Sequence, residues 1–373
     1  MAARLYAYAF LEDLILLYPV YALLFAETGL SAGQISSLFA LWSVTALLVE
    51  VPSGLLADVV SRRLLVAVAP LVVSAGFALW TFWPSYPAFA LGFVLWGTGG
   101  AMRSGALEAL VYEDLARRGA QGAYARLVGR AEAVRTTAEM TATGLAALVI
   151  GAGGHLAVGV ASVVVPLFGA LVGCTFPETR RRGADEDDDE PGFAAVLRDG
   201  LGEARRVPAV RRAVLAVAVL AGLTSLDEYI PLLAKATGVA TATVPLLVLL
   251  VSAATAVGGW FAGKGTRSLS PVLAVAAVCL AAGAAGGRPE GFVLIAVAFA
   301  AFRWACAVTE ARLQDVIDDR ARATVTSLAG LGSEAGAIAV FAGYALASGW
   351  AAPWLVFCLA AVPYLGVAFA LRR

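Results

Sequence analysis

Residues 50–66 read EVPSGLLADVVSRRLLV, and they place charges and a glycine between two apolar runs. Gly54 allows two helices to approach closely and the chain to turn tightly, because glycine has no Cβ. Asp58 stands at the end of the first run, where its carboxylate can accept hydrogen bonds from N–H groups that begin a neighbouring helix, a contact worth about 0.3–1 kcal/mol. Arg62 and Arg63 follow, so the stretch is typical of a charged turn between two helices.

The composition of the whole chain indicates a membrane protein. Of its 373 residues, 60% are hydrophobic and 14% are charged, and the mean hydropathy is +0.83. A soluble domain has roughly 45–50% apolar and about 25% charged residues. Apolar runs near the ~20 residues that cross a bilayer recur throughout. We do not expect the first run to be a cleaved signal peptide, because a similar run follows without a small-residue cleavage site.

Apolar runs and turn signals predict twelve helical spans. They are expected near residues 5–27, 36–57, 64–83, 87–114, 125–151, 155–176, 212–235, 241–262, 270–286, 290–316, 323–347 and 351–371. Alternate connections are rich in arginine, whereas the opposite set carries little beyond His155, Lys235 and Arg288. By the positive-inside rule, the arginine-rich connections and both termini lie in the cytoplasm.

One long connection divides the spans six and six. It predicts an N-terminal bundle over 1–176, a cytoplasmic linker over 177–211 and a C-terminal bundle over 212–373. The linker contains RRRGADEDDDEPGF, which we interpret as a solvated segment rather than a regulatory or lipid-contacting patch. The following GFAAVLRDGLGEARR has helical spacing and is expected to lie amphipathic on the inner face.

Several features of the first six spans recur in the last six. The acid pair Glu12–Asp13 precedes a proline and a Thr-Gly exit, and Asp227–Glu228 does the same. Further matches pair Arg103 with Arg303, Glu108 with Glu310, and Glu132 with Glu334. Parallel halves of this kind are a transporter architecture, with the site near the midplane between them. The sequence therefore predicts an all-α polytopic fold of two six-helix parallel pseudo-repeats.

The loop that opens this section resembles a motif of the major facilitator superfamily. Its GLLADVVSRR follows the pattern G-x-L-a-D-r-x-x-R-[RK], with Val59 where the family has arginine. The stretches SGALEALVYEDL and RARATVTSL resemble a bacterial branch that contains many drug or metabolite efflux permeases. The resemblance covers essentially the whole chain and implies the fold predicted above. An efflux subgroup carries a Gly-Pro motif in its fifth span, and TATGLAALVIGAGG lacks the proline.

The resemblance also implies a gating role for this loop. Asp58 would contact the start of the eleventh span, near Ala323 and Thr324, when the cytoplasmic side is closed. The second-half copy has Gly263 in place of the aspartate, so the first copy would carry the full role. The arginines would bind Asp58 or the acids Glu113 and Asp114, or would only anchor the topology. The gating candidates are Gly54, Asp58, Arg62 and Arg63.

Charges within the spans supply the candidate coupling site. A charge at a helix centre costs about 2.5–3.5 kcal/mol on insertion scales, and such residues usually face a bundle interior. At ~1.5 Å per residue, Asp13 lies about 12 Å and Arg103 about 15 Å above the inner end of their spans, with Glu50 at about 10 Å. The resemblance implies that the first and fourth spans face one cavity, so we expect an Asp13–Arg103 pair, which either exchanges a proton or is a static salt bridge. Glu12 points about 100° away from Asp13.

The full set of proton-coupling or cavity candidates is Asp13, Glu12, Glu50, Arg103, Glu108, Asp227, Glu228, Arg303 and Glu310. Glu132, Arg135 and Glu139 lie nearer the cytoplasmic ends and are expected to be network residues rather than substrate ligands. Aromatic residues that either line a substrate site or pack as core and interfacial anchors are Tyr18, Tyr21, Trp42, Trp96, Tyr112, Tyr229 and Trp304.

No catalytic, metal-binding or cofactor motif accompanies these charges. A phosphate loop, a zinc motif and a nucleophile elbow are missing, and the four cysteines have no metal spacing. We expect no enzyme activity, metal, cofactor or nucleic-acid partner. The predominance of arginine over the two lysines, with abundant alanine, indicates a GC-rich genome and hence a bacterial inner membrane.

The leading functional hypothesis is a secondary transporter that exports a small organic molecule by proton antiport. It would work as a monomer in the lipid bilayer, with the substrate and protons as its partners. An importer or facilitated-diffusion carrier on the same scaffold is the alternative, and the sequence does not separate the two. A non-transporting sensor or membrane enzyme is the third hypothesis, and it would need neither the duplicated halves nor the Asp58 loop.

Overall fold

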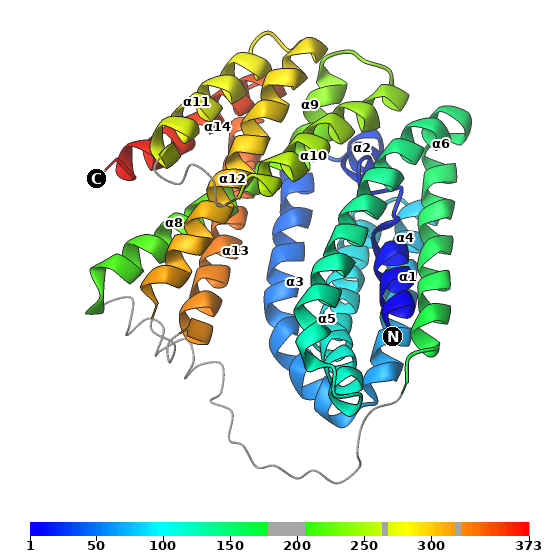
Figure 1. The fold of residues 1–373 in the computed structure, drawn as a ribbon. Helices are drawn as coiled ribbons and strands as arrows, with labels where there is room; N and C mark the ends of the chain where they lie inside the picture. The colour runs from blue at the N-terminus through cyan, green and yellow to red at the C-terminus, as the bar shows by residue number, and fades with distance from the viewer. Residues whose placement is uncertain (178–205, 263–267, 318–321, 373) are drawn as a thin grey trace. The chain divides into compact units, whose positions relative to one another are not determined.

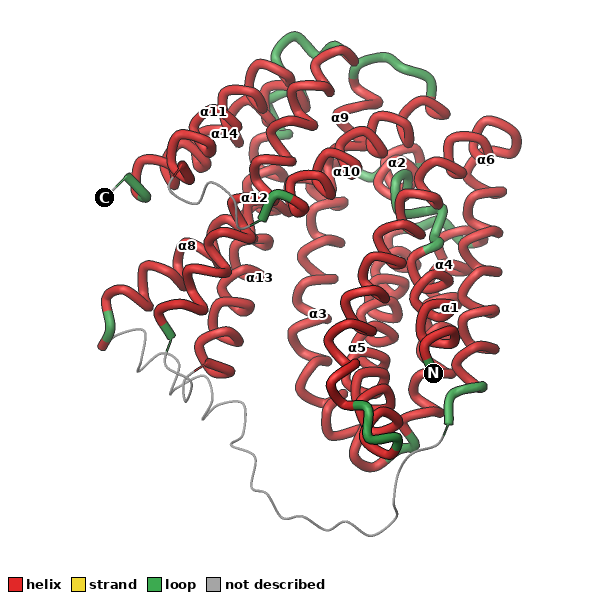
Figure 2. The backbone as a smooth tube through the Cα atoms, viewed as in Figure 1, coloured by secondary structure: helices red, strands yellow, loops and turns green. Residues whose placement is uncertain are grey.

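The computed structural model describes residues 1–177, 206–262, 268–317 and 322–372. All regular elements in these residues are helices (Figure 2). In the first part they are α1 (Ala2–Asp13), α2 (Tyr21–Glu27), α3 (Ala32–Val59), α4 (Arg62–Phe82), α5 (Tyr86–Arg117), η1 (Gln121–Ala123) and α6 (Tyr124–Cys174). After the linker come α8 (Pro208–Thr224), η2 (Ser225–Tyr229), α9 (Ile230–Ala236), η3 (Thr241–Thr243), α10 (Val244–Trp260), α11 (Leu269–Ala284), η5 (Pro289–Gly291), α12 (Phe292–Val316), α13 (Arg322–Ala347) and α14 (Pro353–Ala370).

These helices account for the twelve predicted spans (Figure 1). Among the described residues, eight helical stretches are long and apolar enough to cross a membrane. The fifth and sixth spans are both within α6, which turns back on itself at Gly154 with φ 63° and ψ −163°. A positive φ of this kind favours glycine, which has no Cβ to clash with the backbone. The predicted amphipathic segment after the acidic run lies outside the described residues.

The first span of each half is interrupted, where the sequence predicted continuous helices over 5–27 and 212–235. The helix α1 ends at Asp13 and α2 begins at Tyr21. In the second half α8 gives way to the 3₁₀ turn η2, which contains Asp227 and Glu228, before α9 begins. Apolar periodicity does not reveal such breaks, because the residues on both sides remain apolar.

Backbone groups freed by an interruption inside a membrane need other partners. The N–H of Leu17 donates a hydrogen bond of 2.9 Å to Oγ of Ser162 on the second part of α6. In the second half the hydroxyl of Tyr364 on α14 donates to the carbonyl oxygen of Leu223 at 2.8 Å. In both halves a side chain of the sixth span therefore forms a hydrogen bond with a backbone group at the interruption of the first span.

Two compact units make up the described chain, and each is considered by itself. Unit 1 contains residues 1–30, 41–177 and 241–246, and unit 2 contains 31–40, 206–240 and 247–372. In unit 1, α4 packs against α5 and α6, and α1 packs against α6. In unit 2, α11 packs against α12 and α14, and α8 packs against α13. The same spans of each half are therefore in contact, as the predicted pseudo-repeat requires.

Matched close contacts hold these helices together. Oγ of Ser74 donates to the carbonyl of Val163 at 2.7 Å in unit 1, and Oγ of Ser270 donates to the carbonyl of Ala368 at 2.6 Å in unit 2. Glycine pairs allow the third and fourth spans of each half to touch: a Cβ on Gly76 would lie 2.9 Å from the carbonyl oxygen of Gly92. The corresponding distance from Gly283 to Gly291 is 2.6 Å.

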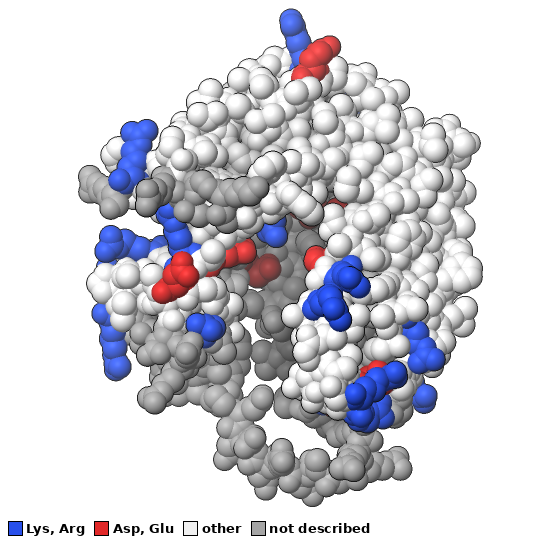
Figure 3. Space-filling view, in the orientation of Figure 1, with Lys and Arg blue, Asp and Glu red and all other residues white. Residues whose placement is uncertain are grey.

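The core of unit 1 is rich in aromatic rings. Trp80 is fully buried, and its Nε1 donates to the carbonyl of Phe89 at 3.0 Å. Its ring centroid lies 4.7 Å from Phe93 and 5.1 Å from Phe25. Apolar side chains also cover much of the outside, and in Figure 3 the outer flank of unit 1 is uncharged over its upper part, with basic side chains toward its lower end. This distribution fits a helical bundle surrounded by lipid.

Candidate functional site

Three helices of unit 1 bring a carboxylate and two guanidinium groups together. Glu12 lies at the end of α1, Arg103 in α5 and Arg135 in α6. Nε of Arg103 forms an ion pair with Oε1 of Glu12, and Nη1 of Arg135 lies 2.8 Å from Oε2 of the same carboxylate. Arg135 also lies 3.8 Å from Oδ2 of Asp13. We call Glu12, Asp13, Arg103 and Arg135 the charge cluster.

The cluster corrects the predicted Asp13–Arg103 pair, because the structure pairs Arg103 with Glu12. Height along the spans matched Arg103 with either acid, since Glu12 and Asp13 differ by only about 1.5 Å. The direction in which each side chain points decides the pairing, and neighbouring residues on a helix differ by about 100°. Sequence position alone does not fix how α1 is rotated about its own axis.

Arg135 is the residue whose central place in the cluster the sequence analysis missed. It was expected to be a network residue near the cytoplasmic end, but it contacts both acids of α1. A weaker contact of 3.9 Å joins it to Glu132 one turn earlier in α6. The sequence would have identified Arg135 only together with the knowledge that the first span packs against the fifth. Counting residues from the loop does not supply that knowledge.

Carboxylates outnumber guanidinium groups around the cluster. Besides Glu12 and Asp13, Glu139 on α6 lies close enough to Asp13 to interact with it electrostatically. The cluster side chains are only 18% to 25% exposed, so their charges are partly removed from water. With Glu132, which is 75% exposed and lies 3.9 Å from Arg135, four of these described carboxylates surround Arg103 and Arg135. A proton taken up by one of the less exposed carboxylates would reduce the excess negative charge.

Next to the cluster three aromatic rings lie in a stack. The centroid of Tyr18 is 5.2 Å from that of Trp96, with the ring planes 18° apart. Trp42 stacks on Trp96 at 5.0 Å and 18°. Tyr18 interacts electrostatically with Asp13 and Glu12, which places the stack beside the acids. All three side chains are partly exposed. Rings of this kind can stack on a flat apolar molecule.

The other aromatic candidates lie in different surroundings. Tyr21 is buried among Phe25, Trp80 and Phe93, and Trp304 is buried in α12. The fully buried Tyr229 shares a hydrogen bond of 2.7 Å with the hydroxyl of Ser36 and stacks on Tyr344 at 3.5 Å. Tyr112 is 52% exposed and contacts Tyr124. Of the residues predicted to line a substrate site, Tyr18 with Trp42 and Trp96 forms the only stack that lies beside the charge cluster among the described residues.

The gating loop is described in part. Arg62 forms an ion pair with Glu113 at the end of α5, one of the arrangements predicted for it. Asp114 is buried and binds Arg118 at 2.9 Å instead. Arg63 is exposed in the first turn of α4. For residues 50–59 the structure describes the backbone only, so the surroundings of Glu50, Gly54 and Asp58 and the predicted contact of Asp58 lie outside the described part of the chain.

The candidate charges of the second half lie along two elements of unit 2. Asp227 is exposed in η2 and interacts electrostatically with Tyr364. Arg303 and Glu310 are exposed on α12 and flank Cys306. Glu228 follows Asp227 in η2, and Glu108 is exposed on α5 near Tyr124 of unit 1. The described residues contain no group of three or more side chains suited to hold a metal ion.

Comparisons with known proteins give a family for this arrangement. A sequence profile described as Major Facilitator Superfamily matches residues 9–309. No curated protein matches the chain significantly.

Solved structures of several transporters have the same fold. A crystal structure of a mutant of the nucleoside transporter NupG has a TM-score of 0.81 at 12% identity, covering 100% of this chain and 98% of the other. An auto-inhibited peptide transporter of the POT family has a TM-score of 0.77 at 13% identity, covering 100% and 96%. A bacterial homologue of the human lysosomal transporter Spinster, inward-facing and occupied, has a TM-score of 0.70 at 16% identity, covering 100% and 93%.

Proposed function

Since the chain belongs to the Major Facilitator Superfamily and is a secondary transporter of a small molecule, we propose that it exports its substrate by proton antiport and that the charge cluster binds the coupling proton. The observation that carries this proposal is the Glu12 carboxylate held between Arg103 and Arg135, with Asp13 at the edge of the same arginine. A charge inside a membrane is costly unless paired, so the surplus carboxylate is the natural proton acceptor.

Asp13 is the carboxylate that we assign to the proton. Glu12 accepts contacts from two arginines, whereas Asp13 has one partner at 3.8 Å and the nearby acid Glu139. A proton on Asp13 leaves Arg135 with Glu12 and the more distant Glu132 as its anionic partners. Loss of that proton draws Arg135 toward both carboxylates. Because the residues concerned lie on α1 and α6, protonation changes how strongly these two helices attract each other.

Export is supported by the sequence motifs. The stretches SGALEALVYEDL and RARATVTSL resemble a bacterial branch that contains many drug or metabolite efflux permeases, whereas the loop with Gly54, Asp58, Arg62 and Arg63 resembles the superfamily as a whole. In this scheme the loop closes the cytoplasmic side, and the arginine-rich ends of the helices face the cytoplasm of a bacterial cell. The stack of Tyr18, Trp96 and Trp42 supplies an apolar face for the substrate, which favours a molecule with a flat ring.

Import or facilitated diffusion is the second candidate. It is favoured by the missing Gly-Pro motif in the fifth span, which departs from the pattern of an efflux subgroup. In that case the charge cluster would be a permanent link between α1, α5 and α6. The two candidates differ in whether proton movement accompanies substrate movement, and in which direction.

The test begins with a thermal-shift screen of the purified protein against drugs and metabolites to find a ligand. That ligand is then loaded into proteoliposomes with a pH gradient, and its flux and the internal pH are recorded together. Antiport predicts that substrate and protons move in opposite directions. Asp13→Asn is expected to bind the ligand but to lose flux driven by the gradient. Glu290→Gln, which changes an exposed carboxylate in η5, is the matched control and should behave as wild type.

Each outcome decides between the candidates. Substrate and protons that move in the same direction would identify a symporter and overturn export. Flux without any proton movement in the wild-type protein would identify a facilitator. Gradient-driven flux that persists in Asp13→Asn would remove Asp13 from the coupling step.

A further inference from the structure

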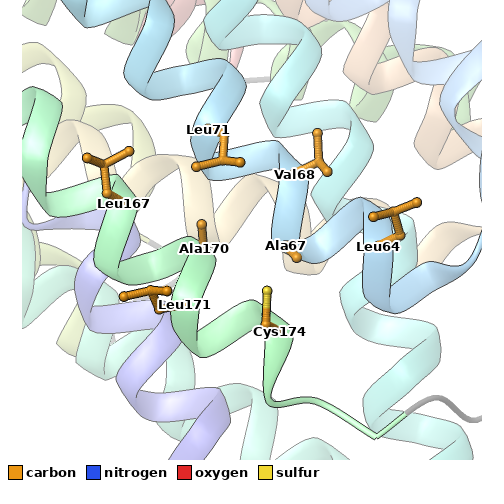
Figure 4. A pocket seen from close by; sticks show the side chains of 8 residues that line it. All are labelled: Leu64, Ala67, Val68, Leu71, Leu167, Ala170, Leu171 and Cys174. Atoms are coloured by element: carbon orange, nitrogen blue, oxygen red, sulfur yellow. The ribbon is translucent and has the colours of Figure 1, made fainter.

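A groove lies on the outside of unit 1 between α4 and the second part of α6, away from the charge cluster. Its volume is about 390 Å³. Figure 4 shows that its lining is apolar except for one thiol, and the residues are Leu64, Ala67, Val68, Leu71, Leu167, Ala170, Leu171 and Cys174. Nothing in this lining offers a hydrogen bond or charge that a polar transport substrate would need.

The groove exists because the two helices approach closely at small residues. A Cβ added to Gly173 would lie 2.8 Å from the carbonyl oxygen of Val66 and from Cα of Ala67. Beside this contact, Ala67, Ala170 and Cys174 leave room above the helix crossing (Figure 4). Small residues at a helix contact, with larger residues around them, leave a narrow groove along the crossing.

Leucines form the two walls of this groove. Leu64 and Leu71 belong to α4, and they are 53% and 45% exposed. Leu167 and Leu171 belong to α6, with exposed fractions of 42% and 64%. In a chain surrounded by a bilayer, exposed apolar walls of this kind face lipid tails rather than water.

The groove is shorter than the depth of one leaflet. From Leu64 to Leu71 the chain advances seven residues, which is roughly 10 Å along a helix. Half of a hydrocarbon core of ~30 Å is about 15 Å. A groove that begins in the first turn of α4 therefore remains within the leaflet on the arginine-bearing side.

A basic residue lies on the helix stripe that leads into the groove. Arg63 is exposed in the first turn of α4, four residues before Ala67, so it lies on the helical stripe that continues into the groove. Arg62 in the same turn forms an ion pair with Glu113. Basic sites between transmembrane helices at a membrane surface bind anionic lipid head groups.

From these observations we propose that the groove binds an anionic phospholipid, with one acyl chain between α4 and α6 and the phosphate beside Arg63. The apolar walls select the chain, and the arginine selects the charge of the head group. This site is separate from the transport site and does not depend on the direction or the coupling of transport.

Native mass spectrometry of the delipidated full-length protein tests the proposal, with phosphatidylglycerol and phosphatidylcholine as probes. At low lipid concentration, wild type is expected to bind one phosphatidylglycerol about five-fold more tightly than phosphatidylcholine, the ratio that corresponds to about 1 kcal/mol for one basic residue at an anionic surface. Arg63→Gln should bind both lipids equally. Leu171→Trp, at the most exposed wall, should reduce the affinity for both.

Cys174 supplies a second readout that does not depend on a variant's folding. Its thiol lines the groove, so phosphatidylglycerol should slow its reaction with a maleimide in detergent.

Val275→Trp on α11 is the matched control, because Val275 is 62% exposed on an apolar face of unit 2 and should leave lipid binding unchanged. Equal affinity of wild type for the two lipids would overturn the head-group assignment. Unprotected Cys174, or full binding by Leu171→Trp, would overturn the groove as the site.

Discussion

Replacing Glu12 by glutamine should destabilise the protein more than replacing Asp13 by asparagine, although Asp13 is the proposed proton carrier. Glutamine keeps the size of Glu12 but removes the charge that faces Arg103 and Arg135. Asparagine at position 13 removes only the contact of 3.8 Å to Arg135. The two variants therefore separate the structural role of the cluster from its coupling role.

The expected magnitudes follow from burial. Removing one partner of a buried pair costs about 3–5 kcal/mol, and an exposed pair contributes about 0–1 kcal/mol. Glu12 and Arg103 are each 22% exposed, and Arg135 is 18% exposed, so Glu12→Gln lies between these limits at about 2 kcal/mol. For Asp13→Asn the long contact gives at most about 1 kcal/mol.

Thermal unfolding of both variants in one detergent, at one scan rate, measures the difference. At about 2–4 °C per kcal/mol for a unit of this size, Glu12→Gln should lower Tm by about 4–8 °C and Asp13→Asn by less than about 4 °C. Adding Arg103→Met to Glu12→Gln should recover part of the loss, because it removes a guanidinium group that has lost its partner. Glu290→Gln is the control for a lost exposed charge.

Two results would refute the reasoning. If Asp13→Asn lowered Tm as much as Glu12→Gln, the two carboxylates would share the arginines equally, and the assignment of distinct roles would be wrong. If Arg103→Met made the Glu12→Gln variant still less stable, Arg103 would have a further partner that matters more than Glu12.

Three further predictions concern unit 1. Gly92→Ala should destabilise it by about 1–3 kcal/mol, because the new Cβ would lie 1.9 Å from Nε1 of Trp80; the shift should appear in tryptophan fluorescence and in Tm. Ser162→Ala should cost about 1–3 kcal/mol by leaving the N–H of Leu17 without its acceptor, which hydrogen exchange at the break would detect. Trp42→Leu, which removes an end ring of the stack, should weaken binding of a ring-containing ligand by about 2- to 10-fold, the loss of about 0.5–1.5 kcal/mol of stacking, measured by titration.

Matched controls are available for each of these variants. Gly100 lies on the same helix as Gly92 and has open space where a Cβ would be, so Gly100→Ala should leave Tm unchanged or raise it. Ser348→Ala removes only a local hydrogen bond to Ala345 and should not affect exchange at the break. Trp350→Leu removes a ring that is 69% exposed and should leave ligand affinity unchanged. Equal effects in a variant and its control would contradict the reason given for that variant.

The fold followed from the sequence because its signals extend over many residues. Runs of apolar side chains, arginine-rich connections and the motif with Asp58 all indicate the same twelve spans, and the family match and the structure confirm that arrangement. The breaks after Asp13 and Thr224 were not predicted, since they depend on partners such as Ser162 and Tyr364 that lie far away in the sequence.

The site was predicted less completely, for a geometric reason. Depth in the membrane depends on counting residues, and it placed the acids of α1 level with Arg103. Pairing depends on the rotation of each helix and on which helices touch, so Glu12 replaced Asp13 as the partner and Arg135 entered the cluster. Of the aromatic candidates, Tyr18 gained its place beside the acids from the turn that follows α1.

The interrupted first span of each half has a consequence for the origin of the chain. Ser162 accepts a hydrogen bond from an N–H at one break, and Tyr364 donates one to a carbonyl at the other. The direction of the hydrogen bond therefore differs between the halves, although both side chains belong to the sixth span of their half. Each break is closed by a side chain from the same half. A single ancestral copy of six helices could thus have supplied this hydrogen bond from within itself, and after duplication the two copies could come to use different hydroxyl groups.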